Sequence, residues 1–211
     1  MAKQNRNFHI PQAQSYSEGV GSGLKRSVEM LPNGQTVMSL SLDFTTAPVP
    51  DRKYVADVAW VVQATDSIKL LFGQNKVSSG LRSLLVINIS PESAKVFINA
   101  IDLVQKPSFR EIAELTQLAI PQLIEITEEP EQTIAFKANI ISGSVSGHDA
   151  CIDFYYISPI SMRNLATMDK AGIDAVVRVD IQVNLFVAFI EQLKVVSQNY
   201  PSIKEYSNEQ L

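Results

Sequence analysis

One short stretch of the sequence brings together residue types that could perform nucleophilic chemistry: Gly147-His148-Asp149-Ala150-Cys151. A Cys thiolate activated by a His base is an established catalytic pairing. Side chains that follow one another in a strand, however, alternate between its two faces, so these neighbours do not converge on one reacting atom. Gly and Asp are also the residues that a tight hairpin turn requires. The stretch is therefore predicted to be a turn from Ser144 to His148, with Cys151 as a packing residue in the following strand.

Two other motifs could bind phosphate or a cation. Gly19-Val20-Gly21-Ser22-Gly23 has closely spaced glycines, but it follows no predicted strand and lacks the third glycine spacing of a dinucleotide-binding loop. A flexible linker is the better interpretation. The acidic run Glu128-Glu129-Pro130-Glu131 could hold an ion, but such runs are usually solvated loops.

Asp153 and Trp60 are the remaining candidates. Asp153 stands between Ile152 and Phe154, so alternation places it on the face opposite those two, in solvent or in a second layer. Trp60 lies among valines in a predicted strand, where an aromatic residue is more often core than a ligand-stacking surface. The sequence therefore predicts no catalytic, cofactor-binding or metal-ligating residue.

The composition removes several classes of function. The chain has 211 residues, 18 Lys and Arg against 22 Asp and Glu, and a net charge of −4, with no basic run longer than Lys25-Arg26. Nucleic-acid binding, which needs a dense positive field, is not expected. Cys151 has no second Cys for an internal disulfide, and with His9 and His148 it cannot complete a four-ligand zinc site.

The same arithmetic bears on location. No run approaches the roughly 18 apolar residues of a membrane span, and Met1 to Ile10 contains no apolar segment of signal-peptide length. A cytoplasmic protein without a membrane span is expected. The length allows one large domain or two small ones.

The elements that position these residues begin after a polar N-terminal stretch, Met1 to Gly23, which is predicted to be a flexible arm unless it is ordered against something else. Alternation from Met38 to Phe44 predicts a half-buried strand, and the turn Pro32-Asn33-Gly34 makes Leu24 to Leu31 its partner. Ala47 to Asp51 is a stiff connector.

A β-β-β-α pattern then follows. Val55 to Ala64, Ile68 to Phe72 and Leu84 to Ile89 are predicted strands, and Ser90-Pro91-Glu92 is a typical helix start. The apolar face of that helix comprises residues at helical spacing: Ala94, Phe97, Ile98, Ile101 and Val104.

The pattern recurs in the second half of the chain. Ile134 to Ser142, Ala150 to Ile157 and Ala175 to Val183 are predicted strands, followed by a helix from Asn184 to Val196 that stops before Pro201. A shift of 92 positions aligns apolar residues of both copies: Ile87 with Val179, Ile89 with Ile181, Phe97 with Phe189, Ile98 with Ile190, and Ile101 with Leu193. An internal duplication is the prediction, although any two amphipathic β-α segments can be aligned to some extent.

Between the copies, Ser108 and Glu111 have capping-box spacing, and Ile112, Leu115 and Ala119 continue a short helix that Pro121 should end. The acidic loop is the expected boundary of the halves. The predicted organisation is a flexible arm (1–23), an N-terminal half (24–127), a second β-β-β-α unit (128–200) and a polar tail (201–211). The predicted fold class is α+β, an antiparallel sheet with helices packed on one side.

Part of the first copy resembles a small bacterial domain family of unknown function. The resemblance covers residues 54–104 and rests on Tyr54-Val55-Ala56, Ile68 to Phe72, Ser83 to Ile89 and the helix start Ser90-Pro91-Glu92-Ser93-Ala94-Lys95. The second copy has Val183-Asn184-Leu185 at the helix start instead. The resemblance implies a fold and a bacterial or phage setting, and no catalytic residues. The layout of sheet and helices is also similar in topology to the export chaperone SecB.

These observations favour a non-catalytic binding or assembly protein, such as a homo-oligomeric or structural subunit of a larger bacterial or phage complex, with a protein as its partner. The chain offers abundant β surface and polar termini for pairing with neighbours. Two alternatives remain open: a chaperone-like binder of apolar segments, and an enzyme whose site lies at the interface of the two halves.

Overall fold

The protein has an α+β fold with mixed sheets. A computed structural model describes residues 14–19, 23–43, 45–76, 80–104, 108–117, 119–121, 133–168 and 171–201. The chain forms two compact units. The hairpin unit comprises Met1–Pro48 and Ser158–Ile173, and the sheet unit comprises Val49–Ile157 and Asp174–Leu211.

The hairpin unit contains a three-stranded antiparallel sheet in the order β1-β2-β3 and the helix α3. Its elements are β1 (Gln14–Gly19), β2 (Leu24–Met30), β3 (Thr36–Leu42) and α3 (Pro159–Met168). The predicted hairpin is confirmed: the Leu31 amide donates to the Gln35 carbonyl at 2.8 Å, and Gly34 takes the positive φ of 82° that the turn needs.

Two elements of this unit differ from the sequence prediction. Residues 14–19 of the predicted flexible arm form β1, which pairs with β2 from Gln14↔Met30 to Gly19↔Lys25. Their polar composition gives no apolar alternation, and it is the pairing with β2 that makes them a strand. The helix α3 was not predicted at all. It begins in the same way as the predicted helix after Ser90, since the Ser158 hydroxyl accepts from the Ser161 amide at 3.1 Å.

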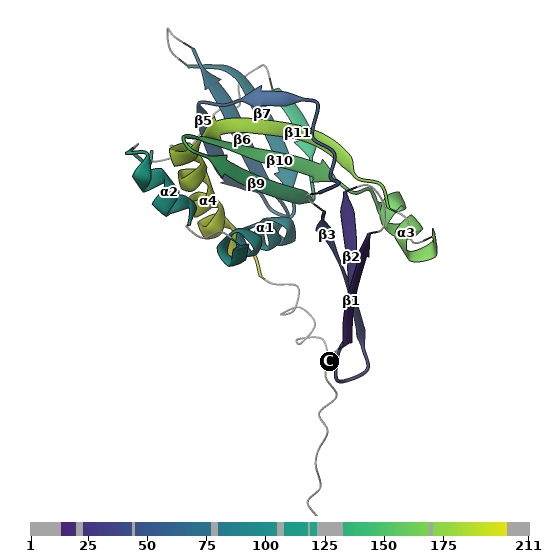
Figure 1. Cartoon of the computed structure of the whole chain (residues 1–211). Helices are drawn as coiled ribbons and strands as arrows, with labels where there is room; N and C mark the ends of the chain where they lie inside the picture. The colour runs from purple at the N-terminus through teal and green to yellow at the C-terminus, as the bar shows by residue number, and fades with distance from the viewer. Residues whose placement is uncertain are drawn as a thin grey trace, which may run out of the picture. The chain divides into compact units, whose positions relative to one another are not determined.

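In its described residues the sheet unit has two four-stranded sheets and three helices (Figure 1). The first sheet has the order β5-β6-β7-β8, and the second has the order β4-β11-β10-β9. The strands are β4 (Lys53–Val55), β5 (Val58–Gln63), β6 (Ile68–Asn75), β7 (Leu81–Ile89), β8 (Thr133–Lys137), β9 (Ile140–Ser146), β10 (Asp149–Tyr156) and β11 (Asp174–Gln182). The helices are α1 (Pro91–Val104), α2 (Phe109–Leu115) and α4 (Val183–Gln198).

The prediction of a purely antiparallel sheet is wrong, because each of the two sheets is mixed. The strand β8 pairs parallel with β7, and β4 pairs parallel with β11. The predicted strands Val55 to Ala64 and Ile134 to Ser142 are each two strands, interrupted at Ala56-Asp57 and Ala138-Asn139. The short strand before each break joins the sheet of the other half of the unit. This exchange explains why the chain does not divide into compact units near residue 128.

The two halves of the sheet unit, β4 to β7 with α1 and β8 to β11 with α4, share their register. The Ala56 amide donates to the Asp180 carbonyl at 3.0 Å, and the Ala138 amide donates to the Asn88 carbonyl at 3.0 Å. Equivalent positions are thus 82 residues apart in the first strands, where 56 corresponds to 138. They are 92 apart after the third strand, where 88 corresponds to 180. The larger spacing accommodates α3 between β10 and β11. Duplication of one ancestral unit stays a prediction.

The main core lies between the inner faces of the two sheets and the helices. Phe72 contacts both Phe154 and Phe189, with ring centroids 5.9 Å and 5.2 Å apart. The predicted core positions Phe97 and Phe189 are buried, as expected. Gly143 on β9 makes room for a core ring, because a Cβ there would lie 2.9 Å from Cζ of Phe186.

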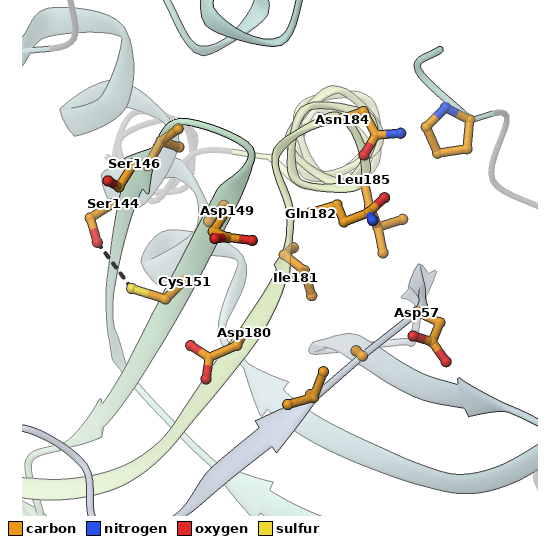
Figure 2. A pocket seen from close by; sticks show the side chains of 15 residues that line it. Asp57, Ser144, Ser146, Asp149, Cys151, Asp180, Ile181, Gln182, Asn184 and Leu185 are labelled. Atoms are coloured by element: carbon orange, nitrogen blue, oxygen red, sulfur yellow. Dashed lines mark hydrogen bonds between the residues drawn. The ribbon is translucent and has the colours of Figure 1, made fainter. Parts of the chain in front are cut away.

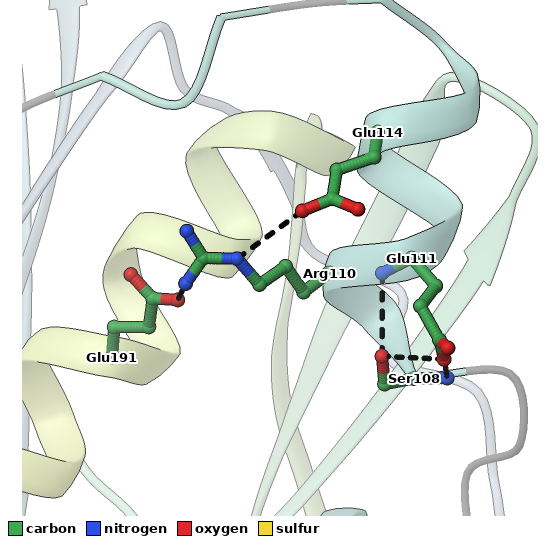
Figure 3. Close-up of polar contacts among 5 residues, drawn as sticks. All are labelled: Ser108, Arg110, Glu111, Glu114 and Glu191. Atoms are coloured by element: carbon green, nitrogen blue, oxygen red, sulfur yellow. Dashed lines mark hydrogen bonds and ion pairs between the residues drawn. The ribbon is translucent and has the colours of Figure 1, made fainter.

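The capping box of α2 is confirmed (Figure 3). The Ser108 hydroxyl accepts from the Glu111 amide at 3.2 Å, and the Ser108 amide donates to Oε2 of Glu111 at 2.7 Å. These hydrogen bonds from Ser108 lower the pKa of Glu111. Arg110 joins α2 to α4 through Glu191, at 2.6 Å between Nη1 and Oε1.

The buried face of α2 differs from the prediction. Phe109 and Ala113 are buried, whereas Leu115 is 80% exposed. The helix also ends at Leu115 rather than at Pro121. Gln117 adopts a positive φ of 59°, which no α-helix continues.

The predicted acidic loop at Glu128–Glu131 and the polar tail from residue 202 lie outside the described residues. Among the helices of the described part, none has the length and apolar character needed to cross a membrane.

Candidate functional site

A pocket of about 870 Å³ opens on the sheet unit where its two halves meet (Figure 2). Val55, Ala56 and Asp57 contribute to it from the end of β4, and Pro121 from the segment after α2. The rest of the lining comes from the second half: Ser144, Val145, Ser146, Asp149, Ala150, Cys151, Asp180, Ile181, Gln182, Asn184 and Leu185. The exchange of β4 between the sheets creates this site, because it brings residues 55–57 beside β11.

The charged groups of the pocket are all acidic. Asp57, Asp149 and Asp180 line it from three different elements, and no Lys, Arg or His belongs to the described lining. The remaining polar groups are hydroxyls, amides and the Cys151 thiol, whose Sγ lies 3.0 Å from Oγ of Ser144 (Figure 2). A cleft lined by one sign of charge concentrates ligands of the opposite sign. The pocket therefore disfavours an anion such as phosphate. Among the described residues its carboxylates do not form a cluster that could hold a metal ion.

The structure separates the residues of the predicted turn. The turn itself is shorter than expected: Ser144 and Ser146 belong to β9, and Gly147 and His148 alone form the turn. The His148 side chain is exposed and does not line the pocket, and its carbonyl accepts from the Val183 amide at 2.9 Å.

Cys151 is half-buried and faces the pocket, not the main core as a packing residue would. Its contact with the Ser144 hydroxyl supplies no base. Within the described residues the Cys-His pairing needed for nucleophilic catalysis is not assembled.

Asp153 lies on the outer face of the second sheet, which we define as the face turned away from the main core. It is 9% exposed and accepts two hydrogen bonds from Arg178, each at 2.7 Å. This carboxylate raises the pKa of Arg178. Sequence reasoning identified Asp153 but missed its partner. The signal was present, since alternation places Arg178 on the same face of the neighbouring strand.

Trp60 lies on the outer face of the first sheet. It is half-buried against a small cluster of Leu71, Leu84 and Val86, separate from the main core. The prediction that Trp60 packs among apolar residues is confirmed, but in a satellite cluster.

A second candidate site is the sheet of the hairpin unit. Among the described elements, the extensive contacts of its strands are with one another. One face carries apolar residues together with Arg26, which pairs with Leu40. Val28, Leu40 and Leu42 there are half-buried and Met30 is 51% exposed, whereas Leu24 is fully buried.

The base of this sheet is firmly held. A Cβ at Gly23, whose φ is +84°, would lie 2.9 Å from the Ala47 Cα and the Pro48 Cδ. Asp43 accepts from the Thr45 hydroxyl at 2.6 Å and the Thr45 amide at 3.1 Å. These bonds lower the pKa of Asp43 to about 2. These contacts hold together the end of the sheet near Gly23. Along the rest of its length the strands have few contacts with other described elements.

Comparisons of the chain with family models, with curated proteins and with solved structures find no match. The resemblance of residues 54–104 to a bacterial domain family stays a prediction.

Proposed function

We propose that the protein is a non-catalytic binding and assembly protein, such as a subunit of a larger bacterial or phage complex. The observation that supports this most is the sheet of the hairpin unit. A sheet needs its apolar face packed against another layer to be stable. Among the described elements its strands make extensive contacts only with one another, so a neighbouring chain is our candidate for the second layer.

Light scattering tests this proposal. The average mass of the full chain should increase with its concentration. A chain shortened to begin at Leu24, which lacks β1, should show a different dependence of mass on concentration. The circular dichroism of the two proteins should agree in helix content, because the shortening removes none of the described helices. A monomer at every concentration in both cases would remove the assembly role and leave transient binding.

A second candidate function, an enzyme or small-ligand binder at the interface of the halves, is favoured by the pocket. Its three carboxylates and its position between the halves match that alternative. The chaperone-like alternative is less well supported, since the pocket mixes acidic and apolar residues and is not a broad apolar groove.

Thermal unfolding in the presence of arginine, spermidine or Mg²⁺ tests the pocket. Binding should raise the unfolding temperature of the native protein, and Asp180→Asn with Asp149→Asn should abolish that rise. The matched control is Asp51→Asn, which removes an exposed carboxylate outside the pocket. No cation-dependent shift in the native protein would eliminate this candidate for these probes.

A further inference from the structure

The strand β3 is an edge of its sheet, and its free side presents backbone groups in a regular row. Among the described strands it pairs with β2 alone, in the order β1-β2-β3, and the register runs from Leu24↔Leu42 to Met30↔Thr36 without a shift. Edge strands of this kind are templates for pairing with another chain unless something protects them.

The hydrogen bonds at the two ends of the hairpin show which groups are free. The Leu31 amide donates to the Gln35 carbonyl, and the Asp43 amide donates to the Gly23 carbonyl. Backbone groups in an antiparallel ladder alternate between the two sides of a strand. Residues 37, 39 and 41 therefore bond to β2, whereas the amides and carbonyls of Thr36, Met38, Leu40 and Leu42 point to the free edge.

The usual protections of an edge strand are missing from β3. Its sequence, TVMSLSL, contains no charged residue, no Pro and no Gly. The unshifted register excludes a β-bulge in its pairing with β2. By contrast, the other edge strand of the sheet, β1, carries Glu18 and Gly19. The contrast makes β3 the edge open to pairing.

Two copies of β3 can pair with each other in a register centred on residue 39. In an antiparallel pair of two β3 strands, the register that uses all four free positions places Thr36 opposite Leu42 of the copy and Met38 opposite Leu40. Residue 39 then lies opposite residue 39 of the copy. No like charges meet, and the two apolar faces lie on the same side because the twofold axis is perpendicular to the sheet.

We propose that two copies of this chain associate through their β3 edges into a continuous six-stranded sheet, β1-β2-β3 followed by β3-β2-β1 of the copy. The inference rests on the proposed assembly role and names its interface. Main-chain hydrogen bonds supply the affinity, as in other strand additions.

A designed disulfide tests the register. In the proposed pair, residue 39 forms a non-hydrogen-bonded pair with its copy, for which Cα atoms lie about 4.5 Å apart, within the range of a disulfide. Ser39→Cys, made with Cys151→Ser so that one thiol remains, should give a covalent dimer under mild oxidation. The matched control is Ser41→Cys in the same background, because residue 41 meets residue 37 of the copy and not itself. We expect at least a tenfold lower dimer yield from the control.

A proline tests the hydrogen bonds. Leu40→Pro removes an amide that points to the free edge and leaves the ladder with β2 intact. It should give a monomer in light scattering with an unchanged circular dichroism spectrum.

The outcomes separate this inference from the proposed function. Association of the native chain without preferential cross-linking of Ser39→Cys overturns the β3 interface and leaves assembly standing. A native chain that is monomeric at all concentrations overturns both. If Leu40→Pro fails to fold, the two cysteine variants decide the result alone.

Discussion

The outer faces of the two halves of the sheet unit differ in chemistry although their backbones match. Equivalent cross-strand rows run over the last three strands of each half: Trp60, Leu71 and Val86 in one, Ser142, Asp153 and Arg178 in the other. The first row is part of an apolar cluster, and the second contains an ion pair. The same register therefore accommodates opposite side-chain chemistry.

The inner faces show what the fold requires. Phe72 and Phe154 are equivalent, both fully buried and in contact with each other. The connectors match as well, since the Asp57 amide donates to the Gly73 carbonyl and the Asn139 amide to the Tyr155 carbonyl. Inner packing and backbone bonds thus fix the topology, and the outer faces are free to diverge.

The largest expected effect tests the equivalence of the inner faces. Phe97→Ala and Phe189→Ala each remove a buried ring at equivalent positions of α1 and α4. Each should lower the free energy of unfolding by about 3–5 kcal/mol in denaturant titration. The exposed Val96→Ala is the matched control for α1, with an effect below about 1 kcal/mol. A loss confined to one of the two phenylalanines would mean that the halves are not equivalent in energy.

The sequence predicted this much of the fold because apolar periodicity is a local signal. It placed the strands Ile68 to Phe72 and Ala175 to Val183, both helix faces and the 92-residue shift. The exchange of β4 and β8 was not predictable, since nothing in the sequence of a strand of three or five residues indicates which sheet it joins. The pocket depends on that exchange. Its residues Asp57 and Asp180 are 123 positions apart in the sequence, and they line one pocket only because β4 pairs with β11.

The second prediction breaks the ion pair of the second half. Arg178→Leu leaves Asp153, whose side chain alone is 12% exposed, without its partner. The free energy of unfolding, measured by denaturant titration, should fall by on the order of 3 kcal/mol. An uncompensated buried charge destabilises the fold by more than the ion pair stabilises it.

The matched variant replaces the pair by the residues of the first half. The double variant Asp153→Leu with Arg178→Val should have a free energy of unfolding within about 1 kcal/mol of that of the native protein, or higher. A double variant as unstable as Arg178→Leu alone would show that the outer face of the second half requires charge.

The third prediction concerns Tyr155, whose equivalent in the first half is Gly73. Burial, with the charge of Asp153, raises the pKa of Tyr155 to about 12. The folded protein keeps the phenol protonated. The stability that Tyr155 contributes in this way is therefore complete below pH 10 and is lost as the pH rises towards 12. The loss is on the order of 2 kcal/mol. Tyr155→Phe should therefore flatten the decline of stability between pH 10 and 12, measured against the native protein. Parallel declines of the two proteins would contradict the assignment.

The smallest expected effect distinguishes the two connectors. Asn139 binds Ile157 twice, donating to its carbonyl and accepting from its amide, each at 2.9 Å, and is half-buried. Asp57 accepts once, from the Asn75 amide at 3.1 Å, and is exposed. Asn139→Ala should cost about 2 kcal/mol and Asp57→Ala about 0.5 kcal/mol in denaturant unfolding.

The isosteric exchanges make this last comparison decisive. Asp57→Asn keeps the accepting oxygen and should change stability by less than about 0.5 kcal/mol. Asn139→Asp loses the donor to the Ile157 carbonyl and sets a carboxylate against it, so it should be at least as unstable as Asn139→Ala. Equal effects of the two exchanges would mean that the side chains do not determine the strand exchange and that the backbone bonds of Ala56 and Ala138 suffice for it.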